Sequence, residues 1–174
     1  GRMSFQKGLD VLMDSMDSFE GDPGFDLAIA GKGELSDWLE DRLSSSRAKE
    51  HISILGLVSD SEKRWIYENS DCIVIPSRFE GLPTVMLEAM HSGTPVIMAD
   101  VNGLGAMVEG HGCGLSVPPE DPHSLARAMT EAANSDPETS SSWGSSGKEA
   151  SKEYQWDRVT DRVLEVYRRV IGNV

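Results

Sequence analysis

The sequence of 174 residues predicts an α/β fold, a doubly wound parallel sheet with a helical C-terminal tail. Apolar runs of strand length alternate with segments whose apolar residues recur at helical spacing. The runs are apolar almost throughout, as in strands that are buried on both faces. Each run is bounded by Gly, Pro or Asp, which is typical of strand ends. The intervening helices then supply the right-handed crossovers that parallel strands require.

The order of the predicted elements follows from these patterns. Five runs are predicted to be strands, at residues 25–31, 51–57, 71–76, 94–99 and 113–117. The segments predicted to be helices are residues 7–16, 33–45, 61–70, 84–93 and 121–134. Nothing resembling an internal repeat interrupts this alternation, so we interpret residues 1–174 as a single domain.

The C-terminal part differs from the rest. From about residue 138 the chain is predicted to be helical, so that residues 138–174 form a C-terminal helical segment. The serine-rich stretch 139–147 favours a poor helix or a connection between helices. Beyond it, apolar residues from Trp156 to Val170 recur along one side of a helix. This amphipathic helix is expected to pack on this domain or on an adjoining one.

The first residues also bear on domain organisation. Gly1 and Arg2 stand directly before the first predicted helix, without a strand in front of it. A doubly wound fold normally has a strand at that place. We therefore expect that a first strand, and with it a further N-terminal domain, is absent from this sequence.

Composition limits the classes of function. The formal net charge of −13 argues against nucleic acid or an anionic membrane as the main partner. No run approaches the roughly 20 apolar residues of a membrane-spanning helix, and no signal peptide is visible, so a cytoplasmic protein is expected. Cys72 and Cys113 both lie in apolar runs, which favours buried structural thiols over a disulfide or a catalytic pair.

Glycines follow several predicted strands. Gly31 and Gly33 follow the first strand, Gly56 lies at the end of the second, and Gly81 follows the third. In open α/β sheets ligands bind beyond the carboxyl ends of the strands, where glycine lets the backbone approach a ligand closely. A single glycine more often only marks a turn. The clustering of several glycines at one edge of the sheet is what indicates a binding site.

The start of the helix at residues 84–93 is the most informative feature. Pro83 suits the first turn and Gly93 the far cap. The backbone from Leu82 to Val85 and the helix dipole favour an anion, such as phosphate, at this N-terminus. Thr84 and Glu88 share one helix face. Glu88 repels phosphate, so it is expected to accept hydrogen bonds from ribose hydroxyls, although a solvated surface glutamate explains it equally simply.

Positive charge for such an anion has to come from particular side chains in so acidic a chain. Arg2 and Lys7 flank the first turn of the first predicted helix, where the fold directs them to the same edge. Taken singly, either residue is more simply explained as a surface charge.

These residues resemble a known family. The letters "GR", "KG", "AGKGE", "SDCIVIPSRFEGLPTVMLEAMHSGTPVI", "GCGLSV" and "WDRVTDRVLEVY" are similar to the C-terminal donor-binding domain of a retaining GT-B glycosyltransferase, within glycosyltransferase family four. The resemblance covers essentially the whole chain. Its most specific part is residues 70–97, with two glutamates in an E-x7-E spacing.

The resemblance implies roles for individual residues. It assigns Arg2 and Lys7 to the donor diphosphate, Glu80 and Gly81 to the transferred sugar, and Glu88 to the ribose. It assigns Gly31 and the backbone of residues 55–58 to the base pocket. Gly105 and Ala106 stand where the family often has Pro and Glu, so the resemblance leads us to expect that a polar contact in that loop is absent.

The resemblance also implies a reaction and its partners. A sugar passes from a UDP- or GDP-type sugar donor to an acceptor hydroxyl with retention, in polysaccharide, lipopolysaccharide or glycolipid biosynthesis. The acceptor, a glycan or lipid-linked glycan, would bind the missing domain, with membrane contact peripheral at most. No D-x-D triplet is present, so neither a metal nor another cofactor is expected.

Other interpretations stay open. A non-catalytic nucleotide-sugar-binding module fits the same residues, and so does a nucleotide-sugar epimerase of GT-B-like fold, although the E-x7-E block disfavours it. A dinucleotide-dependent oxidoreductase is weaker still, because no G-x-G-x-x-G follows a strand.

Overall fold

The computed structural model describes residues 1–172 and confirms the predicted α/β fold. Its strands are β1 (Leu27–Ala30), β2 (Ile52–Gly56), β3 (Ile73–Ile75), β4 (Val96–Ala99) and β5 (Gly114–Val117). Every strand pair is parallel, as predicted. The strands form two hydrogen-bonded groups, β1-β2 and β3-β4-β5, with no ladder between β1 and β3 among the described residues.

The helices alternate with these strands along the chain. They are α1 (Leu9–Asp17), α2 (Ser36–Ser44), α3 (Asp60–Asn69), α4 (Thr84–Ser92), α5 (Leu104–Gly110), α6 (Pro122–Ala133), α7 (Pro137–Ser151) and α8 (Trp156–Ile171), with 3-10 turns η1 (Phe5–Lys7), η2 (Lys49–His51) and η3 (Lys152–Tyr154). Side chains cap three of the helix starts, at Ser59, Asp121 and Asp136. Helix α5 was not predicted, because residues 102–110 read as a glycine-bearing loop.

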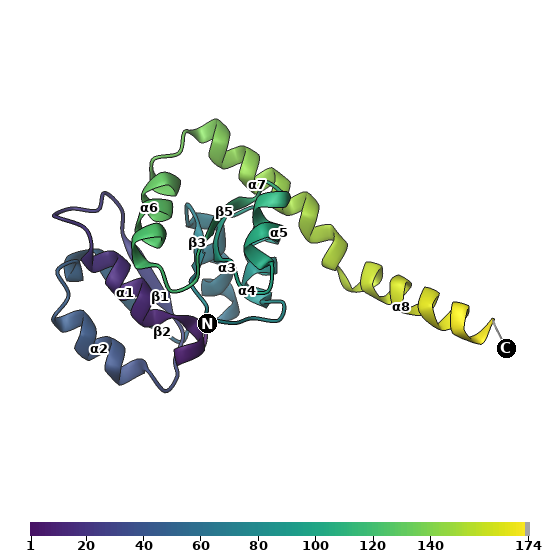
Figure 1. Ribbon diagram of the computed structural model, residues 1–174, viewed down its shortest axis with the longest axis horizontal. Helices are drawn as coiled ribbons and strands as arrows, with labels where there is room; N and C mark the ends of the chain where they lie inside the picture. Colours follow the sequence, from purple (N-terminus) through teal and green to yellow (C-terminus); the bar gives the residue numbers. More distant parts are fainter. Residues whose placement is uncertain (173–174) are drawn as a thin grey trace.

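Helices cover both faces of the strands (Figure 1). The four residues of β4 are all buried, and they alternate between two cores, as a strand covered on both faces requires. Ile97 and Ala99 belong to one core with α1, α2 and α6, whereas Val96 and Met98 belong to the other with α4 and α5. This arrangement confirms the doubly wound layering.

Helix α7 decides between the two alternatives that the sequence left open for residues 139–147. The serine-rich stretch 139–147 lies within α7 and is helical throughout, not a connection between helices. It packs on α4 through small residues: a Cβ built on Gly144 would lie 2.3 Å from the carbonyl oxygen of Gly93. Glycine and serine, poor helix formers, are thus tolerated here because they permit close approach of two helices.

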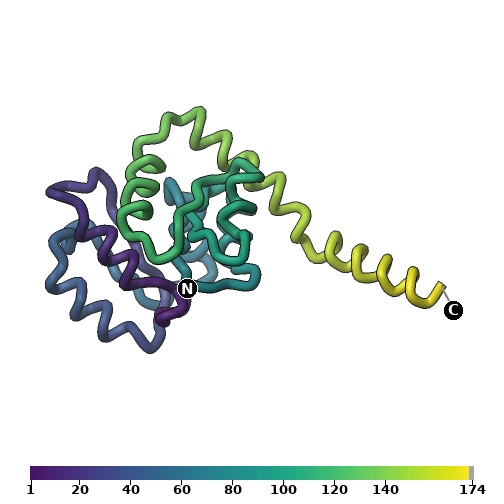
Figure 2. The backbone as a smooth tube through the Cα atoms, viewed as in Figure 1, coloured from purple at the N-terminus to yellow at the C-terminus, as the bar shows by residue number. Residues whose placement is uncertain are grey.

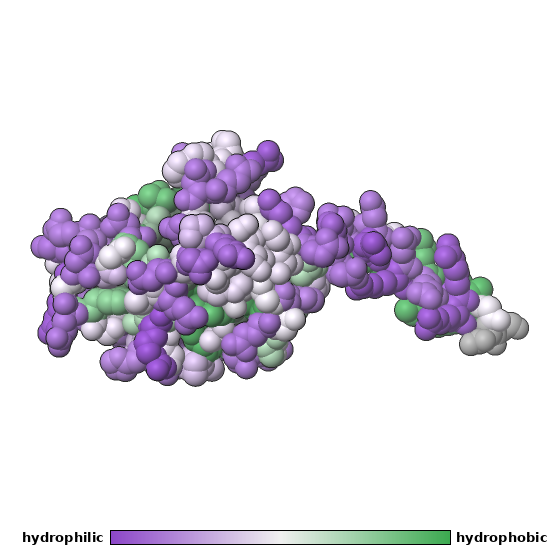
Figure 3. Space-filling view, turned by 90° about the horizontal axis from the view of Figure 1, so that it is seen from above, coloured by the Kyte–Doolittle hydropathy of each residue, from purple (hydrophilic) through white to green (hydrophobic). Residues whose placement is uncertain are grey.

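Helix α8 excludes one of the two packing partners expected for it, this domain, and leaves the other, an adjoining domain, as a prediction. It projects away from the remainder of the molecule (Figures 1 and 2) and buries none of its residues. Trp156 is 84% exposed, and hydrophobic residues lie among hydrophilic ones along the projecting helix (Figure 3). The amphipathic helix therefore does not pack on the described part of this domain. Residues 173 and 174 of the predicted segment 138–174 lie outside the described residues.

Both cysteines are free, as predicted, with Cys113 buried and Cys72 half-buried. Burial raises the pKa of the Cys72 thiol to about 12, and it raises the pKa of Cys113 as well. Both groups are therefore protonated, unreactive thiols at neutral pH. In residues 1–172, every helix is too short or too polar to cross a membrane.

Candidate functional site

A cavity of about 730 Å³ runs along β1 and β3 and reaches the carboxyl ends of these strands. The predicted site residues that line it are Arg2, Lys7, Gly31, Glu80, Pro83, Thr84, Val85 and Glu88. Leu57 and Val58 of the predicted base pocket line it too. The fold thus brings together side chains from the first and third crossovers, as the carboxyl-edge rule predicts.

Four predicted residues lie outside the cavity lining: Gly33, Gly56, Gly81 and Leu82. Glycine at position 33 is explained by packing, because a Cβ there would lie 2.2 Å from the carbonyl oxygen of Met3. Gly56 adopts a positive φ of 68° at the end of β2. Gly81 has open space around it, and Leu82 beside it is 48% exposed.

Glu80 is a buried carboxylate held by two donors. Its residue is only 8% exposed. Lys7 Nζ and Ser77 Oγ both donate to Oε1, at 2.5 and 2.8 Å. Oε2 accepts no hydrogen bond within residues 1–172. Every fully buried side-chain oxygen or nitrogen among these residues has a hydrogen-bond partner, so Oε2 is not fully buried and is accessible. One carboxylate oxygen is thus anchored by the protein, and the other is left for a hydroxyl donor.

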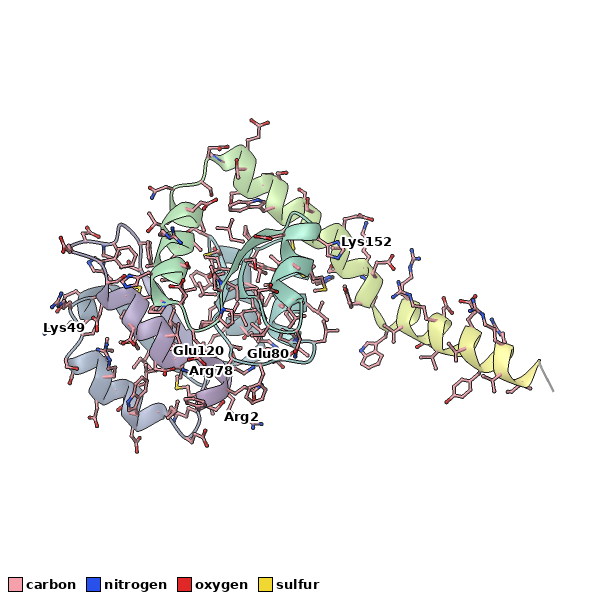
Figure 4. All side chains as sticks on the ribbon, in the orientation of Figure 1. Arg2, Lys49, Arg78, Glu80, Glu120 and Lys152 are labelled. Atoms are coloured by element: carbon pink, nitrogen blue, oxygen red, sulfur yellow. The ribbon has the colours of Figure 1, made fainter. Side chains whose placement is uncertain are left out.

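The loop that carries Glu80 is fixed to the η1 turn by Arg78. This guanidinium donates to both carboxylate oxygens of Asp10 at 2.8 Å and to the carbonyl of Phe5 at 2.8 Å. It also donates to Glu120 at 3.0 Å, and these two side chains are labelled next to each other in Figure 4. The hydrogen bonds from Arg78 lower the pKa of Asp10. The network holds the segment of Lys7 against the loop of Glu80.

Helix α4 begins at the cavity with an open N-terminus. Pro83 is its N-cap, not a first-turn residue as predicted, and no side chain caps the helix. Its first turn contains no acidic residue, in contrast to α3, where Ser59 and Glu62 form a capping box. The orphan N–H groups and the positive end of the helix dipole are therefore free to meet an anion. Gly93 caps the far end with φ 80°, as predicted.

Glu88 faces the cavity one turn further along α4 from Thr84, as predicted. Lys63 Nζ donates to Oε1 at 3.0 Å and Tyr67 OH to Oε2 at 2.8 Å. Burial, and then the bond to Glu88, raise the pKa of Tyr67, so that its hydroxyl remains a donor. The Glu88 side chain is 38% exposed, which leaves room for further donors from a ligand.

Arg2 lines the cavity but is exposed, and its side chain lies at the outer edge of the molecule in Figure 4. None of the ion pairs within residues 1–172 includes it. Arg2 and Lys7 therefore line the same cavity in different environments. Lys7 forms an ion pair with Glu80, whereas Arg2 forms none within residues 1–172.

The structure explains the residues of the loop in which the sequence departs from the family pattern. A Cβ on Gly105 would lie 2.2 Å from Ser116 Oγ, so no larger residue fits that position. Asn102 stands in the left-handed region, with φ 53°, and its Nδ2 donates to the backbone carbonyl of Glu80 at 2.6 Å. The loop thus does supply a polar contact to the site, from Asn102.

Sequence reasoning missed Lys63, Tyr67, Ser77, Arg78 and Asn102. Lys63 and Tyr67 carried a signal, because they stand four residues apart and share one face of a predicted helix. Arg78 lies within residues 70–97, two positions before Glu80, and no local pattern indicates which residues it pairs with. Asp10 and Glu120 stand 68 and 42 residues from it, so only the tertiary fold reveals the network.

Comparison with known proteins identifies the family of this chain. Residues 1–150 match the family model for glycosyl transferases group 1. An uncharacterised glycosyltransferase of Methanocaldococcus jannaschii is 30% identical over 175 residues, covering 97% of this chain and 43% of that protein. The structure of sucrose-phosphate synthase from Thermosynechococcus elongatus matches with a TM-score of 0.83 and 25% identity, covering 100% of this chain and 45% of that one. HepE from Anabaena, solved with UDP-glucose, matches with a TM-score of 0.79 and 21% identity, covering 97% and 47%.

The doubly wound fold, with its site at the carboxyl edge, is therefore that of the C-terminal domain of a GT-B glycosyltransferase. Within this class, the chain belongs to the glycosyl transferases group 1 family. It spans about half the length of the relatives that it matches.

Proposed function

We propose that the protein binds a nucleoside-diphosphate sugar and, in a full-length enzyme, transfers the sugar to an acceptor hydroxyl with retained anomeric configuration. The observation that carries this proposal is the pair Glu80 and Glu88 in one cavity, with the open N-terminus of α4 between them. A diphosphate fits the helix terminus, and each carboxylate suits hydroxyl groups on either side of it.

The proposed positions of the ligand follow from charge. The phosphates meet the backbone N–H groups at Thr84 and Val85, where no protein carboxylate competes in the first turn. Ribose hydroxyls donate to Glu88, whose oxygens are oriented by Lys63 and Tyr67. The sugar hydroxyls donate to the accessible Oε2 of Glu80. The two glutamates thus hold the two ends of one ligand and do not act as the acid and nucleophile of a hydrolase.

Cleavage of the glycosyl–phosphate bond builds negative charge on the leaving diphosphate. Lys7, Arg2 and the α4 dipole are suited to stabilise that charge as it develops. Lys7 is already oriented by its 2.5 Å contact with Glu80, which reduces the reorganisation needed in the transition state. These cationic groups replace a bridging metal in the proposal, so binding is expected to be independent of divalent ions.

The acceptor and the cellular setting are also proposals. The acceptor is a glycan or a lipid-linked glycan, bound mainly by a domain outside this chain, in the cytoplasm or at the inner face of a membrane. A chain with this fold alone then acts as a donor-binding module, because catalysis in a two-domain cleft needs both halves.

Titration calorimetry with UDP, GDP and ADP tests the nucleotide site directly. We expect at least one of them to bind with a dissociation constant in the micromolar to millimolar range, roughly −4 to −8 kcal/mol. UDP is the first choice, because the Anabaena neighbour was solved with UDP-glucose. Addition of EDTA is expected to leave the affinity unchanged. Absence of heat with all three nucleotides contradicts the proposed site, and loss of binding with EDTA contradicts its independence of metal.

A further inference from the structure

Two residues outside the cavity adopt a backbone conformation that their side chains disfavour. Within residues 1–172, the non-glycine residues with a positive φ are Asn102, at 53°, and Glu120, at 60°. In this left-handed region the Cβ of an L-residue crowds the following carbonyl, so glycine is favoured there, Asn is tolerated and Glu is uncommon. Both residues are exposed, so packing in the core does not require their side chains. Strain that persists at an exposed residue points to a role for that residue.

Both side chains contact the Glu80 loop, residues 76–83, which connects β3 to α4. Asn102 lies between β4 and α5, and its Nδ2 donates to the backbone carbonyl of Glu80 at 2.6 Å. Glu120 lies between β5 and α6, and its Oε1 accepts from Arg78 Nε at 3.0 Å. Figure 4 labels Glu120 beside Arg78. The two residues with a positive φ thus meet one loop, from the ends of two neighbouring strands.

Glu120 completes the set of acceptors around Arg78. The Arg78 side chain is only 10% exposed, and its guanidinium makes five hydrogen bonds, as many as its five N–H groups allow. The acceptors are the carbonyl of Phe5 and the carboxylates of Asp10 and Glu120. Without the Glu120 side chain, Arg78 Nε has no partner in the described chain. Glu120 therefore fixes the orientation of Arg78, two residues before Glu80.

Asn102 fixes Glu80 at the main chain. Lys7 and Ser77 already hold the Oε1 atom of Glu80 at 2.5 and 2.8 Å, and Asn102 adds a bond to the carbonyl of the same residue. A shift of the main chain at Glu80 displaces Oε2, the accessible oxygen, relative to the N-terminus of α4. Neither Asn102 nor Glu120 lines the cavity, so each can act on a ligand only through the Glu80 loop.

We propose that Asn102 and Glu120 are positioning residues, which hold Glu80 in the geometry that the sugar end of the donor requires. The inference rests on the proposed function for the ligand, whereas the fixing of the loop does not depend on a ligand. Glycine at either position relieves the backbone strain and at the same time removes the hydrogen bond to the loop. We therefore expect stability and sugar binding to change independently, as at sites where strain serves function.

Asn102→Gly and Glu120→Gly test the proposal, with Asn134→Gly as the matched control. Asn134 Nδ2 also donates to a backbone carbonyl, that of Thr130 at 2.9 Å, but its φ is −99°. Glycine at Asn134 thus removes the same kind of bond without relieving strain, and the thermal midpoint is expected to fall by roughly 2 °C or more. The two test variants are expected to match or exceed the midpoint of the parent chain.

Calorimetry with UDP and UDP-glucose measures the effect on the sugar end. Both test variants are expected to weaken UDP-glucose by about tenfold and UDP by less than about twofold, while the control changes neither. In a Glu80→Gln background the same substitutions are expected to add less than about twofold, because the group that they position is already altered.

NMR order parameters of the ligand-free protein give a readout that needs no ligand. Those of the Phe79 and Glu80 amides are expected to fall from about 0.85, typical of rigid backbone, towards about 0.6 in both test variants. The control is expected to leave them unchanged.

Several results overturn the proposal. Unchanged order parameters at Phe79 and Glu80 in the test variants exclude the fixing of the loop, and a fall in midpoint as large as that of the control excludes relief of strain. Equal losses for UDP and UDP-glucose, or an undiminished loss in the Glu80→Gln background, exclude action through Glu80. A parent chain that binds neither ligand contradicts the proposed function instead, and the order parameters then decide whether Asn102 and Glu120 fix the loop.

Discussion

At the scale of single residues, the site is organised by carboxylates that the protein has already partly satisfied. Glu80 is buried, with one oxygen bonded to Lys7 and Ser77, and breaking such a buried pair is costly. Its orientation is therefore set before a ligand arrives. Glu88 is half-exposed and receives one donor on each oxygen. The two glutamates differ in environment, and they are expected to differ in their effect on binding.

Substitution of the two glutamates separates their roles. Glu88→Ala is expected to weaken both UDP and UDP-sugar by roughly 10- to 100-fold, because it removes charge-assisted hydrogen bonds to the shared nucleoside. Glu80→Gln, which preserves shape, is expected to weaken only the sugar nucleotide. Calorimetry with both ligands measures the two effects, and Glu40→Gln, an exposed residue on α2, serves as the control. Equal losses for both ligands in both variants contradict this division of roles.

At the scale of elements, the two ends of α4 serve different purposes, one for ligand binding and the other for packing. Its N-terminus is left open towards the cavity, while Met86, Ala89 and Met90 are fully buried. Its C-terminus is closed by the left-handed Gly93 and covered by α7. The end that meets the ligand is thus free of protein partners, whereas the far end is fixed by close packing on a glycine-bearing helix.

The packing of α7 on α4 can be tested at Gly144. Gly144→Ala places a Cβ 2.3 Å from a backbone carbonyl, so one helix has to move, and we expect a loss of about 1–3 kcal/mol in the free energy of unfolding. Gly110→Ala is the matched control, because its Cβ meets nothing within 4 Å. The control is expected to be neutral or slightly stabilising. Urea unfolding measures both, and equal stabilities of the two variants contradict the close contact.

At the scale of the whole molecule, the domain consists of a layered body and a projecting helix. The two cores lie on opposite faces of β4, and Figure 1 shows α8 extending beyond both. Because α8 buries no residue, it adds little to the cohesion of the body. Its apolar side, which includes Val166 and Tyr167, is exposed in this chain.

Removal of residues 156–174 tests this independence. The thermal midpoint of the body is expected to stay within about 2 °C of that of the parent chain, while the helical signal in far-UV circular dichroism decreases. Calorimetry or circular dichroism melting measures the midpoint. A fall of more than about 5 °C contradicts the independence, because it requires α8 to stabilise the body through more than the ion pair from Arg162 to Glu153 of η3.

Much of the fold was predictable, because its signals are local. The periods of the apolar residues located the five strands, and the observed strands are shorter only by their frayed ends. Glycine hid α5 and left open whether residues 139–147 of α7 form a helix or a connection, since glycine and serine disfavour helices in isolation and are accepted here for tertiary packing. The terminal helix was located correctly, but the choice between this domain and an adjoining one as its partner stayed open, because an amphipathic pattern does not identify what covers it.

By itself, the sequence determined the doubly wound class, the edge at which the site lies and the two glutamates of the E-x7-E block. These follow from spacing along the backbone, which does not depend on distant residues. Tertiary structure alone decided that Lys7 meets Glu80 across 73 residues, that Arg78 joins their two segments, and that the strands form the two groups β1-β2 and β3-β4-β5. Such contacts depend on which crossovers lie side by side, and topology, not local pattern, sets that arrangement.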